Sequence, residues 1–284
     1  MYVSKNTHAP TVYAATYDHH SLARLALVGD LRRAIDERQL VVHYQPQAVT
    51  DTGEVRRVEA LVRWQHPEQG LLGPDEFIPP AEHTGLIRSL THFVLDTALG
   101  QCRAWHDEGS QLSVAVNITG RELMDLRFCD EVAELLAKWR IESRYLELEI
   151  TETTVMTDLP RARGVLAGLS DLGVRLAIDD FGSGHSSLGY LKRLPFDVIK
   201  IDKSFVQNMD LDIGDEAIVR STIEIGHSLG LEIVAEGVET EEAKRHLQEL
   251  GCDALQGYYV GRPQAASSVH GAVPQPLRQD EQVP

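Results

Sequence analysis

Eight short apolar runs recur along the chain, and each carries a polar or charged residue at or near its end. The runs are VVHYQ, RVEALV, LSVAVN, YLELE, VRLAIDD, DVIKID, LEIVAE and ALQGYY. Segments with helical spacing separate the later runs, such as the one with Val132, Leu135, Leu136 and Trp139. This alternation predicts an α/β fold with a parallel sheet, and eight strands favour a closed, TIM-like (β/α)8 barrel.

The polar residues at the ends of these runs are the candidate site, because a barrel brings its strand ends to one mouth. Carboxylates that lie so close together cannot all stay ionised without a compensating cation. An all-oxygen set of ligands favours Mg²⁺ or Mn²⁺ over zinc. The sequence therefore predicts divalent metal and chemistry at the mouth. The residues are Gln45, Glu59, Asn117, Glu149, Asp179, Asp180, Lys200, Glu236 and Gln256.

Each of these residues, taken alone, also has a plain structural interpretation. Glu59 could face solvent or pair with Arg63, which lies on the same strand face. Asn117 could form a turn, and Lys200 could belong to an ordinary buried ion pair. The adjacent acids Asp179–Asp180 could cap a helix. Followed by the pliable FGSG segment, they also fit two metal ions that clamp a phosphodiester for in-line attack by water.

Composition narrows the class of function. The 284 residues include 27 basic and 43 acidic side chains, and the net charge of −16 argues against general nucleic-acid binding or contact with an anionic membrane. The chain has no apolar run of membrane-spanning length and no signal-peptide core, so we expect a cytoplasmic location. Cys102, Cys129 and Cys252 form no CxxC pair, which fits a reducing compartment.

Three parts of the chain are expected. Residues 1–20 are polar and irregular, residues 21–264 hold the barrel, and residues 265–284 have the composition of a disordered tail. A helix from Ser21 to about Glu37 is expected before the first strand. Between residues 67 and 111 we expect a long insertion followed by one helix. Gly230 and Gly251 are expected to end two later helices, and Thr240 to begin the second of them.

The order of motifs resembles one family. The tripeptide Glu59-Ala60-Leu61 lies within EALVR, and further motifs are YQPQ, FIPPAEHTGLI, AVNIT, LELEITE, DDFGSGHSSLGYL, VIKIDKSFV, EIVAEGVETEE and GCDALQGYYVGRP. Across about residues 28–264 the chain resembles the EAL domain, a cyclic-di-GMP phosphodiesterase. The resemblance implies a TIM-like barrel whose first strand is antiparallel, two divalent cations, Mg²⁺ or Mn²⁺, and hydrolysis of cyclic-di-GMP to linear pGpG.

The resemblance also implies a role for each matched residue. Ligands of the first metal would be Glu59, Asn117, Glu149 and Asp179. Ligands of the second would be Asp179, Asp180 and Glu236. Lys200 would contact the nucleophilic water and act in catalysis with Glu236 and Glu59. Glu152 resembles the glutamate that anchors the loop after Asp180, and the substrate would be contacted by Gln45, Arg63 and Gln256.

The resemblance further implies a homodimer through the DDFG loop and the neighbouring helix, and inhibition by Ca²⁺, whose bonds are longer and looser. The chain departs from the usual motifs at a few positions. His185 replaces a common Tyr, Pro80 a usual Leu, and Gln47 a common Lys or hydrophobic residue. None of these changes removes a predicted metal ligand.

The N-terminal residues MYVSK, followed by LARLALVGDLRRAI, resemble the end of a GGDEF domain that runs into an EAL domain. The chain is therefore expected to be the C-terminal part of a longer GGDEF–EAL protein, which could itself be membrane-associated. The alternative function is a catalytically weak EAL module that senses cyclic-di-GMP or binds other proteins.

Overall fold

The structure is a computed structural model that describes residues 27–269, apart from residues 36, 38, 183–188 and 190. The segment expected at 1–20 and residues 270–284 of the expected tail lie outside the described residues. Residues 27–35 form the described part of the helix expected from Ser21. The described chain continues past residue 264 through a short 3-10 helix, η4 (Ala266–Ser268), to the buried Val269.

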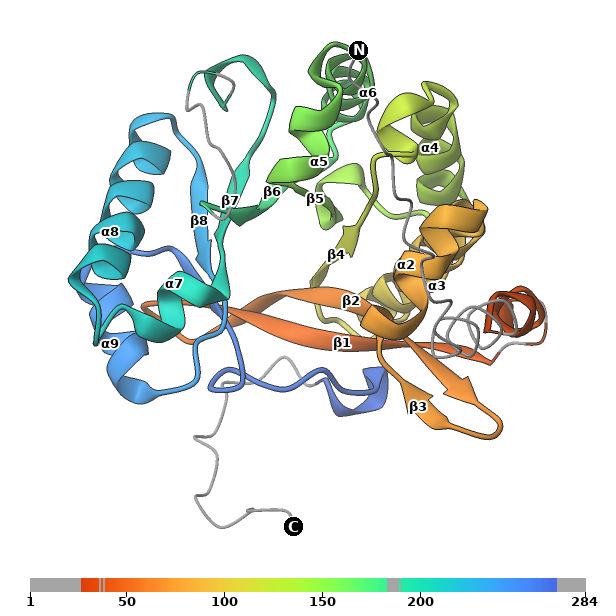
Figure 1. Cartoon of the computed structure of the whole chain (residues 1–284), viewed down its shortest axis with the longest axis horizontal. Helices are drawn as coiled ribbons and strands as arrows, with labels where there is room; N and C mark the ends of the chain where they lie inside the picture. The colour runs from red at the N-terminus through yellow and green to blue at the C-terminus, as the bar shows by residue number, and fades with distance from the viewer. Residues whose placement is uncertain (1–26, 36, 38, 183–188, 190, 270–284) are drawn as a thin grey trace, which may run out of the picture.

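Eight strands close into a barrel (Figure 1). The ring runs in the order β1 (Leu40–Val49), β9 (Ala254–Gln256), β8 (Glu232–Ala235), β7 (Val198–Ile201), β6 (Arg175–Phe181), β5 (Leu146–Thr151), β4 (Ser113–Asn117) and β2 (Val55–His66), which pairs back with β1. β1 runs antiparallel to both of its neighbours, and the other neighbouring pairs of the ring are parallel. The expected TIM-like barrel and its antiparallel first strand are confirmed.

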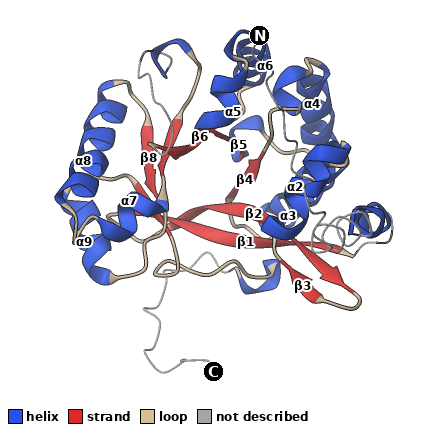
Figure 2. Cartoon of the chain, in the orientation of Figure 1, coloured by secondary structure: helices blue, strands red, loops and turns tan. Residues whose placement is uncertain are grey.

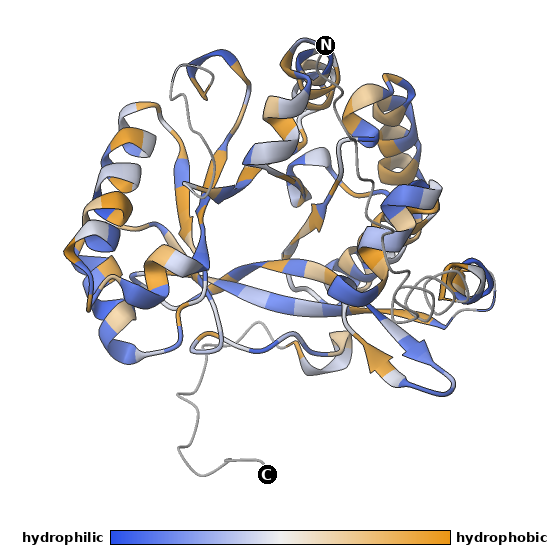
Figure 3. Ribbon diagram, in the orientation of Figure 1, coloured by the Kyte–Doolittle hydropathy of each residue, from blue (hydrophilic) through white to orange (hydrophobic). Residues whose placement is uncertain are grey.

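Helices surround the barrel on the outside (Figure 2). They are α2 (Pro74–Thr84), α3 (Ile87–Asp107), α4 (Arg127–Trp139), α5 (Glu152–Thr157), α6 (Leu159–Asp171), α7 (Lys203–Asn208), α8 (Ile213–Ser228) and α9 (Glu241–Glu249), with single 3-10 turns η1 (Glu122–Met124), η2 (Ser143–Tyr145) and η3 (Leu191–Arg193). The helices mix hydrophobic and hydrophilic residues (Figure 3), as expected when one stripe of each helix packs inward and the other meets water. None of the helices in the described ranges is long and apolar enough to cross a membrane.

Alternate residues of the strands face either the core between strands and helices or the interior of the barrel. On β5, Leu146, Leu148 and Ile150 are fully buried and join the large hydrophobic core between strands and helices. Glu147 and Glu149 alternate with them and are also fully buried, so they point to the opposite face, into the barrel. A separate small apolar cluster of Ala177, Val198, Val234 and Ala254 fills part of the barrel interior.

The insertion between residues 67 and 111 holds more structure than the sequence predicted. A third strand, β3 (Gly70–Leu72), forms a hairpin with β2, and α2 precedes the expected helix α3. Prolines ordinarily interrupt helices, which is why Pro79 and Pro80 concealed α2. The ends of α2 carry the usual signals, because Pro74 lies in its first turn and Gly85 follows it with φ 82°.

The expected ends of two later helices are confirmed. Gly230, with φ 76°, follows α8, and Gly251, with φ 81°, follows α9. The Thr240 hydroxyl oxygen accepts a hydrogen bond from the Ala243 N–H at 3.1 Å and so begins α9.

A network of buried and half-buried charges lies at the amino ends of the strands. One Arg57 nitrogen lies 3.2 Å from Glu147 Oε1 and another lies 3.2 Å from Glu232 Oε2. Arg175 Nε lies 3.2 Å from Glu147 Oε2, and its Nη2 contacts Glu232 as well. Two guanidinium groups thus face two carboxylates, so the charges of this amino-end network cancel without a further ion.

Candidate active site

The residues predicted from strand ends meet at the carboxyl end of the barrel. The two members on the antiparallel pair, Gln45 on β1 and Glu59 on β2, are direct cross-strand partners. The remaining members lie at or near the carboxyl ends of successive parallel strands. They are Asn117 on β4, Glu149 on β5, Asp179 and Asp180 on β6, Lys200 on β7, Glu236 directly after β8 and Gln256 on β9.

Lys200 lies at the centre of this mouth and is completely buried. Its Nζ lies 2.7 Å from both Glu149 Oε2 and Glu236 Oε1. It lies 3.5 Å from Asp179 Oδ1 and 3.7 Å from Glu59 Oε2. Burial by itself would lower the pKa of Lys200, but the carboxylates around it raise that pKa well above the ordinary value. Lys200 is therefore a permanent cation at the mouth.

Several acids of the mouth have raised pKa values in the absence of metal. Burial, together with the neighbouring Glu59, holds the pKa of Glu149 well above its usual range. Burial raises the pKa of Glu236 to about 8, although Lys200 opposes the shift. Burial and like charge raise the pKa of Asp180 to about 6. One ammonium group thus does not compensate all of these carboxylates.

Glu59 behaves in the opposite way. Burial would raise its pKa, but the charge of Lys200 and hydrogen bonds from Gln256 and Asn117 together hold the pKa below its usual value. Gln256 Nε2 donates to Glu59 Oε2 at 2.5 Å, and Asn117 Nδ2 donates to Glu59 Oε1 at 2.6 Å. Neighbouring acids whose pKa values are pushed apart in this way are typical of active sites.

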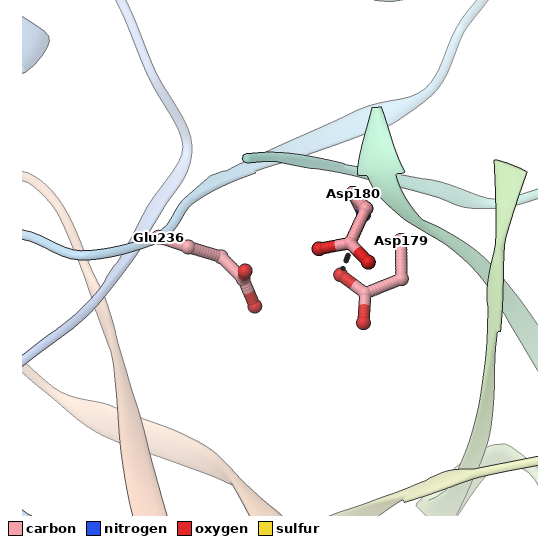
Figure 4. Close-up of side chains that lie close together, drawn as sticks. All are labelled: Asp179, Asp180 and Glu236. Atoms are coloured by element: carbon pink, nitrogen blue, oxygen red, sulfur yellow. Dashed lines mark hydrogen bonds between the residues drawn. The ribbon is translucent and has the colours of Figure 1, made fainter. Parts of the chain in front are cut away.

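The backbone at Asp180 turns both adjacent aspartates into the mouth. Neighbouring residues on a regular strand point to opposite faces, so Asp179 and Asp180 could not both face the site on an ideal β6. Asp180 instead has φ 53°, and the pairing of β6 with β7 shifts register between Ile178 and Phe181. A left-handed backbone is costly for a residue other than glycine, and such strain is concentrated at functional sites. Figure 4 shows the resulting approach of the two carboxylates to Glu236.

The donor set fits hard divalent cations. Asp179, Asp180 and Glu236 each offer a carboxylate oxygen, and the three oxygens lie within 4.8 Å of one another. These are the residues expected to bind the second metal. Glu149 Oε1 is buried and accepts no hydrogen bond from any described residue, which suits a metal ligand. Oxygen donors with surplus negative charge are what Mg²⁺ and Mn²⁺ prefer.

A cavity of about 440 Å³ opens beside the acids. Asn117, Asp179 and Asp180 line it on the barrel side. The wall from α2 and α3 is mainly apolar and includes Ile78, Pro79, Leu90 and Val94. The cavity therefore joins an acidic floor to an apolar wall. The wall suits a flat ring, and the floor would accept a phosphate only when bound cations offset its negative charge.

The residues predicted to contact substrate lie around the same mouth. Gln45 Nε2 donates to the Gly261 carbonyl oxygen at 3.1 Å, and Gln45 Oε1 accepts from Gln256 Nε2 at 3.2 Å. Arg63 is half-buried and donates to the Val62 carbonyl oxygen at 2.8 Å. Their contact with substrate stays a prediction.

Glu152 begins α5 and is buried. Its Oε2 accepts a hydrogen bond from the Gly182 N–H at 3.3 Å, at the base of the loop that follows Asp180. This geometry fits the predicted anchoring role, which itself stays a prediction. His185, and with it the part of the loop expected to contact a second subunit, lies outside the described residues.

Sequence reasoning missed the polar residues deeper in the barrel. Gln47 Nε2 donates to Gln256 Oε1 at 2.8 Å, directly beneath the mouth. Glu147 precedes Glu149 by two residues, so period-two alternation could have placed it inside the barrel. The same alternation places Gln47 inside the barrel from Gln45, but its contact with Gln256 has no local signal, because Gln256 lies on a strand distant in sequence.

The family model for the EAL domain matches residues 28–263 of this chain. The chain belongs to the EAL-domain family. The resemblance drawn from its motifs is thereby confirmed. In this EAL domain Glu59 enters the charged cluster, and Ala60 and Leu61 line the adjoining cavity.

Curated relatives of this EAL domain are longer proteins. MucR of Pseudomonas aeruginosa, a bifunctional diguanylate cyclase/cyclic di-GMP phosphodiesterase, is 42% identical over 262 residues, which are 92% of this chain and 38% of MucR. The cyclic di-GMP phosphodiesterase NbdA of the same species is 43% identical over 240 residues, covering 84% of this chain and 31% of NbdA. The chain therefore spans well under half the length of these relatives.

A solved structure gives the same fold. The MucR phosphodiesterase from Pseudomonas aeruginosa, in complex with c-di-GMP, superposes with a TM-score of 0.82 and 45% sequence identity. The match covers 85% of this chain and 98% of that chain. The EAL enzyme Bd1971, in its cAMP- and cyclic-di-GMP-bound form, also reaches a TM-score of 0.82 at 29% identity, over 87% of this chain and 68% of that chain.

Proposed function

We propose that this EAL domain hydrolyses cyclic-di-GMP to linear pGpG in a reaction that depends on divalent metal. The observation that carries the proposal is the crowding of acids around the buried Lys200, with salt-bridge distances of 2.7 to 3.7 Å to four carboxylates. A module that only senses the nucleotide has no need for surplus buried charge, which costs stability. The phosphodiesterase names of MucR and NbdA support the same activity.

The residues that would hold the metals are those that the resemblance implied. Asp179, Asp180 and Glu236 would hold one ion, and Glu59, Asn117 and Glu149, with Asp179, would hold the other. Bound divalent cations lower the pKa of water and neutralise charge on a phosphodiester.

Side chains of the mouth can orient water, move a proton and offset negative charge. Lys200 keeps its proton, so it can orient a water molecule by donating to it and can offset negative charge that develops at the phosphodiester. Without metal, burial raises the pKa of Glu236 to about 8, so this group mostly carries a proton at neutral pH. A bound cation would ionise it, and it could then serve as a ligand or accept a proton. The apolar wall of α2 and α3 would cover a nucleobase and exclude water.

The test is the purified protein with cyclic-di-GMP in Mg²⁺, Mn²⁺, Ca²⁺ or excess EDTA, with the products separated by chromatography. We expect pGpG with Mg²⁺ or Mn²⁺, none with EDTA, and inhibition by Ca²⁺. Tight nucleotide binding in calorimetry without any product would support the sensor alternative instead. Full turnover in Ca²⁺ alone would contradict the assigned metal preference.

We also propose that the domain forms a homodimer through the loop after Asp180 and the helices that follow β7. Leu211, between α7 and α8, and Ile213, the first residue of α8, are 89% and 88% exposed. They lie two residues apart in the chain and offer an apolar surface that a second subunit would cover. Light scattering would give the mass of the wild type and of a Leu211→Ser/Ile213→Ser variant. A wild type that stays monomeric at high concentration would contradict the dimer, and a variant that stays dimeric would exclude these two side chains.

A further inference from the structure

A row of hydrogen-bonded side chains crosses the barrel interior from the amino-end network to the mouth. Arg57 Nη1 donates to Gln47 Oε1 at 3.2 Å. Gln47 Nε2 donates to Gln256 Oε1 at 2.8 Å, and Gln256 Nε2 donates to Glu59 Oε2 at 2.5 Å. Strand register produces this row, because Gln47 on β1 lies opposite both Arg57 on β2 and Gln256 on β9.

The two ends of the row fix the direction of every hydrogen bond within it. A guanidinium group only donates and an ionised carboxylate only accepts. Both Glu59 oxygens accept amide hydrogen bonds, Oε1 from Asn117 and Oε2 from Gln256, so this carboxyl group is the acceptor at the end of the row. Each amide between the ends must therefore turn its oxygen toward Arg57 and its N–H groups toward Glu59. Reversal of the Gln256 amide would set an oxygen acceptor against the Glu59 carboxylate.

We infer that Gln47 is a positioning residue for the mouth, which holds the Gln256 amide in the orientation that donates to Glu59 and Gln45. Gln47 and Gln256 are only 3% and 4% exposed, so water does not readily replace the bond between them. The inference rests on the proposed function, in which Glu59 is a metal ligand. It assigns a role to a position at which the chain departs from the usual motif.

Three substitutions at Gln47 distinguish its effect on the orientation of the Gln256 amide from its effect on packing inside the barrel. Gln47→Glu places an acceptor opposite Gln256, so the Gln256 amide turns its N–H groups away from Glu59. Gln47→Lys keeps a donor opposite Gln256 and preserves the amide, although it adds a cation beside Arg57. Gln47→Met provides neither donor nor acceptor and leaves Gln256 Oε1 without its partner.

The experiment measures the dissociation constant of Mg²⁺ by calorimetry, without nucleotide, for the wild type and the three variants. Gln47→Glu is expected to weaken Mg²⁺ binding about 10-fold or more, as is usual when a group that orients a ligand is lost. Gln47→Met is expected to lose less, and Gln47→Lys to recover most of the affinity. Gln248→Glu controls for added negative charge, because Gln248 lines the same amino-end cavity of about 500 Å³ as Gln47 and Arg57 but is exposed and lies outside the row.

Thermal melting of the metal-free variants distinguishes positioning from a structural role. A structural role predicts that affinity follows melting temperature and that Gln47→Lys, beside Arg57, is the most damaging variant. Positioning predicts that Gln47→Glu loses more affinity than Gln47→Lys whatever their melting temperatures. If Gln47→Glu fails to fold, the order of Gln47→Met and Gln47→Lys decides in the same way.

Nuclear magnetic resonance of the metal-free protein provides a readout that does not depend on the proposed function. The side-chain amide signals of Gln256 are assigned by their loss in Gln256→Glu. They are expected to exchange slowly in the wild type and in Gln47→Lys, and to move in Gln47→Glu. A wild type that binds no Mg²⁺ would defeat the proposed function, and these signals alone would then test the row. Unchanged Gln256 signals in Gln47→Glu would overturn the inference.

Discussion

The two ends of the barrel hold buried charge in different proportions. At the amino ends, Arg57 and Arg175 face Glu147 and Glu232, two cations against two anions. At the mouth, Lys200 meets four carboxylates within 4 Å, and Asp180 adds another acid beside them. Both ends consist of charged side chains, and β2, β5 and β6 carry members of both sets. They differ in whether the protein supplies all the positive charge that its acids need.

The balanced charges at the amino ends are typical of a structural network, whereas the excess of acids at the mouth is typical of a cation-binding site. In the amino-end network two guanidinium groups balance two carboxylates in charge, although Arg57 Nε and Glu147 Oε1 have no hydrogen-bond partner among the described residues. At the mouth, burial and the neighbouring acids together raise the pKa of Glu236 to about 8 and that of Asp180 to about 6. The acids of the metal-free mouth therefore repel one another, and a bound cation would reduce this repulsion.

The largest expected effect comes from a single acid of the mouth. Asp179→Asn should reduce turnover of cyclic-di-GMP about 10³-fold, since charge stabilisation by a metal is worth several kcal/mol and each 1.36 kcal/mol is tenfold in rate. The metal-free variant should melt near the wild type, because Lys200 keeps its contacts with Glu149 and Glu236. Turnover assays and melting curves check both points. Near-normal turnover would contradict the assignment of Asp179 as a metal ligand.

Removal of the central cation tests the imbalance directly. Lys200→Met should destabilise the metal-free protein by about 3–5 kcal/mol at pH 8, because it leaves buried carboxylates without their ammonium partner. Denaturant unfolding measures this loss. Lys138→Met is the control, since its ion pair with Asp96 at 2.5 Å is exposed and should be worth less than about 1 kcal/mol. Equal losses in the two variants would show that Lys200 does not hold the acids together.

The pH dependence of the metal-free protein should reveal the surplus charge. The folded pKa values of Glu236 and Asp180, about 8 and about 6, exceed the ordinary values of 4.5 and 3.8, so the folded state binds more protons than the unfolded state. Their contribution to stability is complete below the ordinary pKa values and is lost as pH rises through 8. The melting temperature in EDTA should therefore fall by roughly 5–10 °C from pH 6 to pH 8, because ionisation of these groups costs about 2–3 kcal/mol over that range.

Two controls accompany that measurement. Saturating Mg²⁺ should remove the fall, because the ion binds the ionised carboxylates. Glu236→Gln, which no longer titrates, should flatten the pH dependence in EDTA. A melting temperature that rises from pH 6 to pH 8 in EDTA would contradict the proposed charge balance at the mouth.

The smallest effect is expected at the amino ends. Arg175→Met should cost about 1 kcal/mol, because Arg175 is 31% exposed and Arg57 remains beside both carboxylates. Turnover and Mg²⁺ affinity should stay near wild type, in contrast to Asp179→Asn. A large loss of Mg²⁺ affinity in Arg175→Met would mean that the two ends are not independent in charge.

Much of the barrel could be predicted because its signals are local. Each parallel strand is a short apolar run, and a polar residue such as Asn117 or Lys200 marks its carboxyl end. The order of runs and helical segments then determines a closed ring. Helix α2 escaped prediction because Pro79 and Pro80 are read as breaks, although tertiary packing keeps the helix intact.

The parts of the site that escaped prediction depend on register between strands distant in sequence. Gln47 meets Gln256 only because β1 closes the ring against β9, and no local pattern gives that alignment. Arg57 and Glu232 likewise form an ion pair at the amino ends of strands that are distant in sequence. The turn at Asp180 leaves no signature in residue type, because a left-handed aspartate looks like any other aspartate in the sequence.

The closure of the ring through β1 has a consequence for synthesis of the chain. The hydrogen bond between Gln256 and Glu59 joins residues 197 positions apart. Strand β1 gains its second neighbour in the ring only when β9 has been synthesised. Until β9 leaves the ribosome, β1 presents an open edge and Glu59 lacks the hydrogen bond from Gln256. Contacts of such long sequence separation form slowly. We expect nascent chains stalled before residue 254 to bind no Mg²⁺ at the mouth and to gain that ability once the final strand docks.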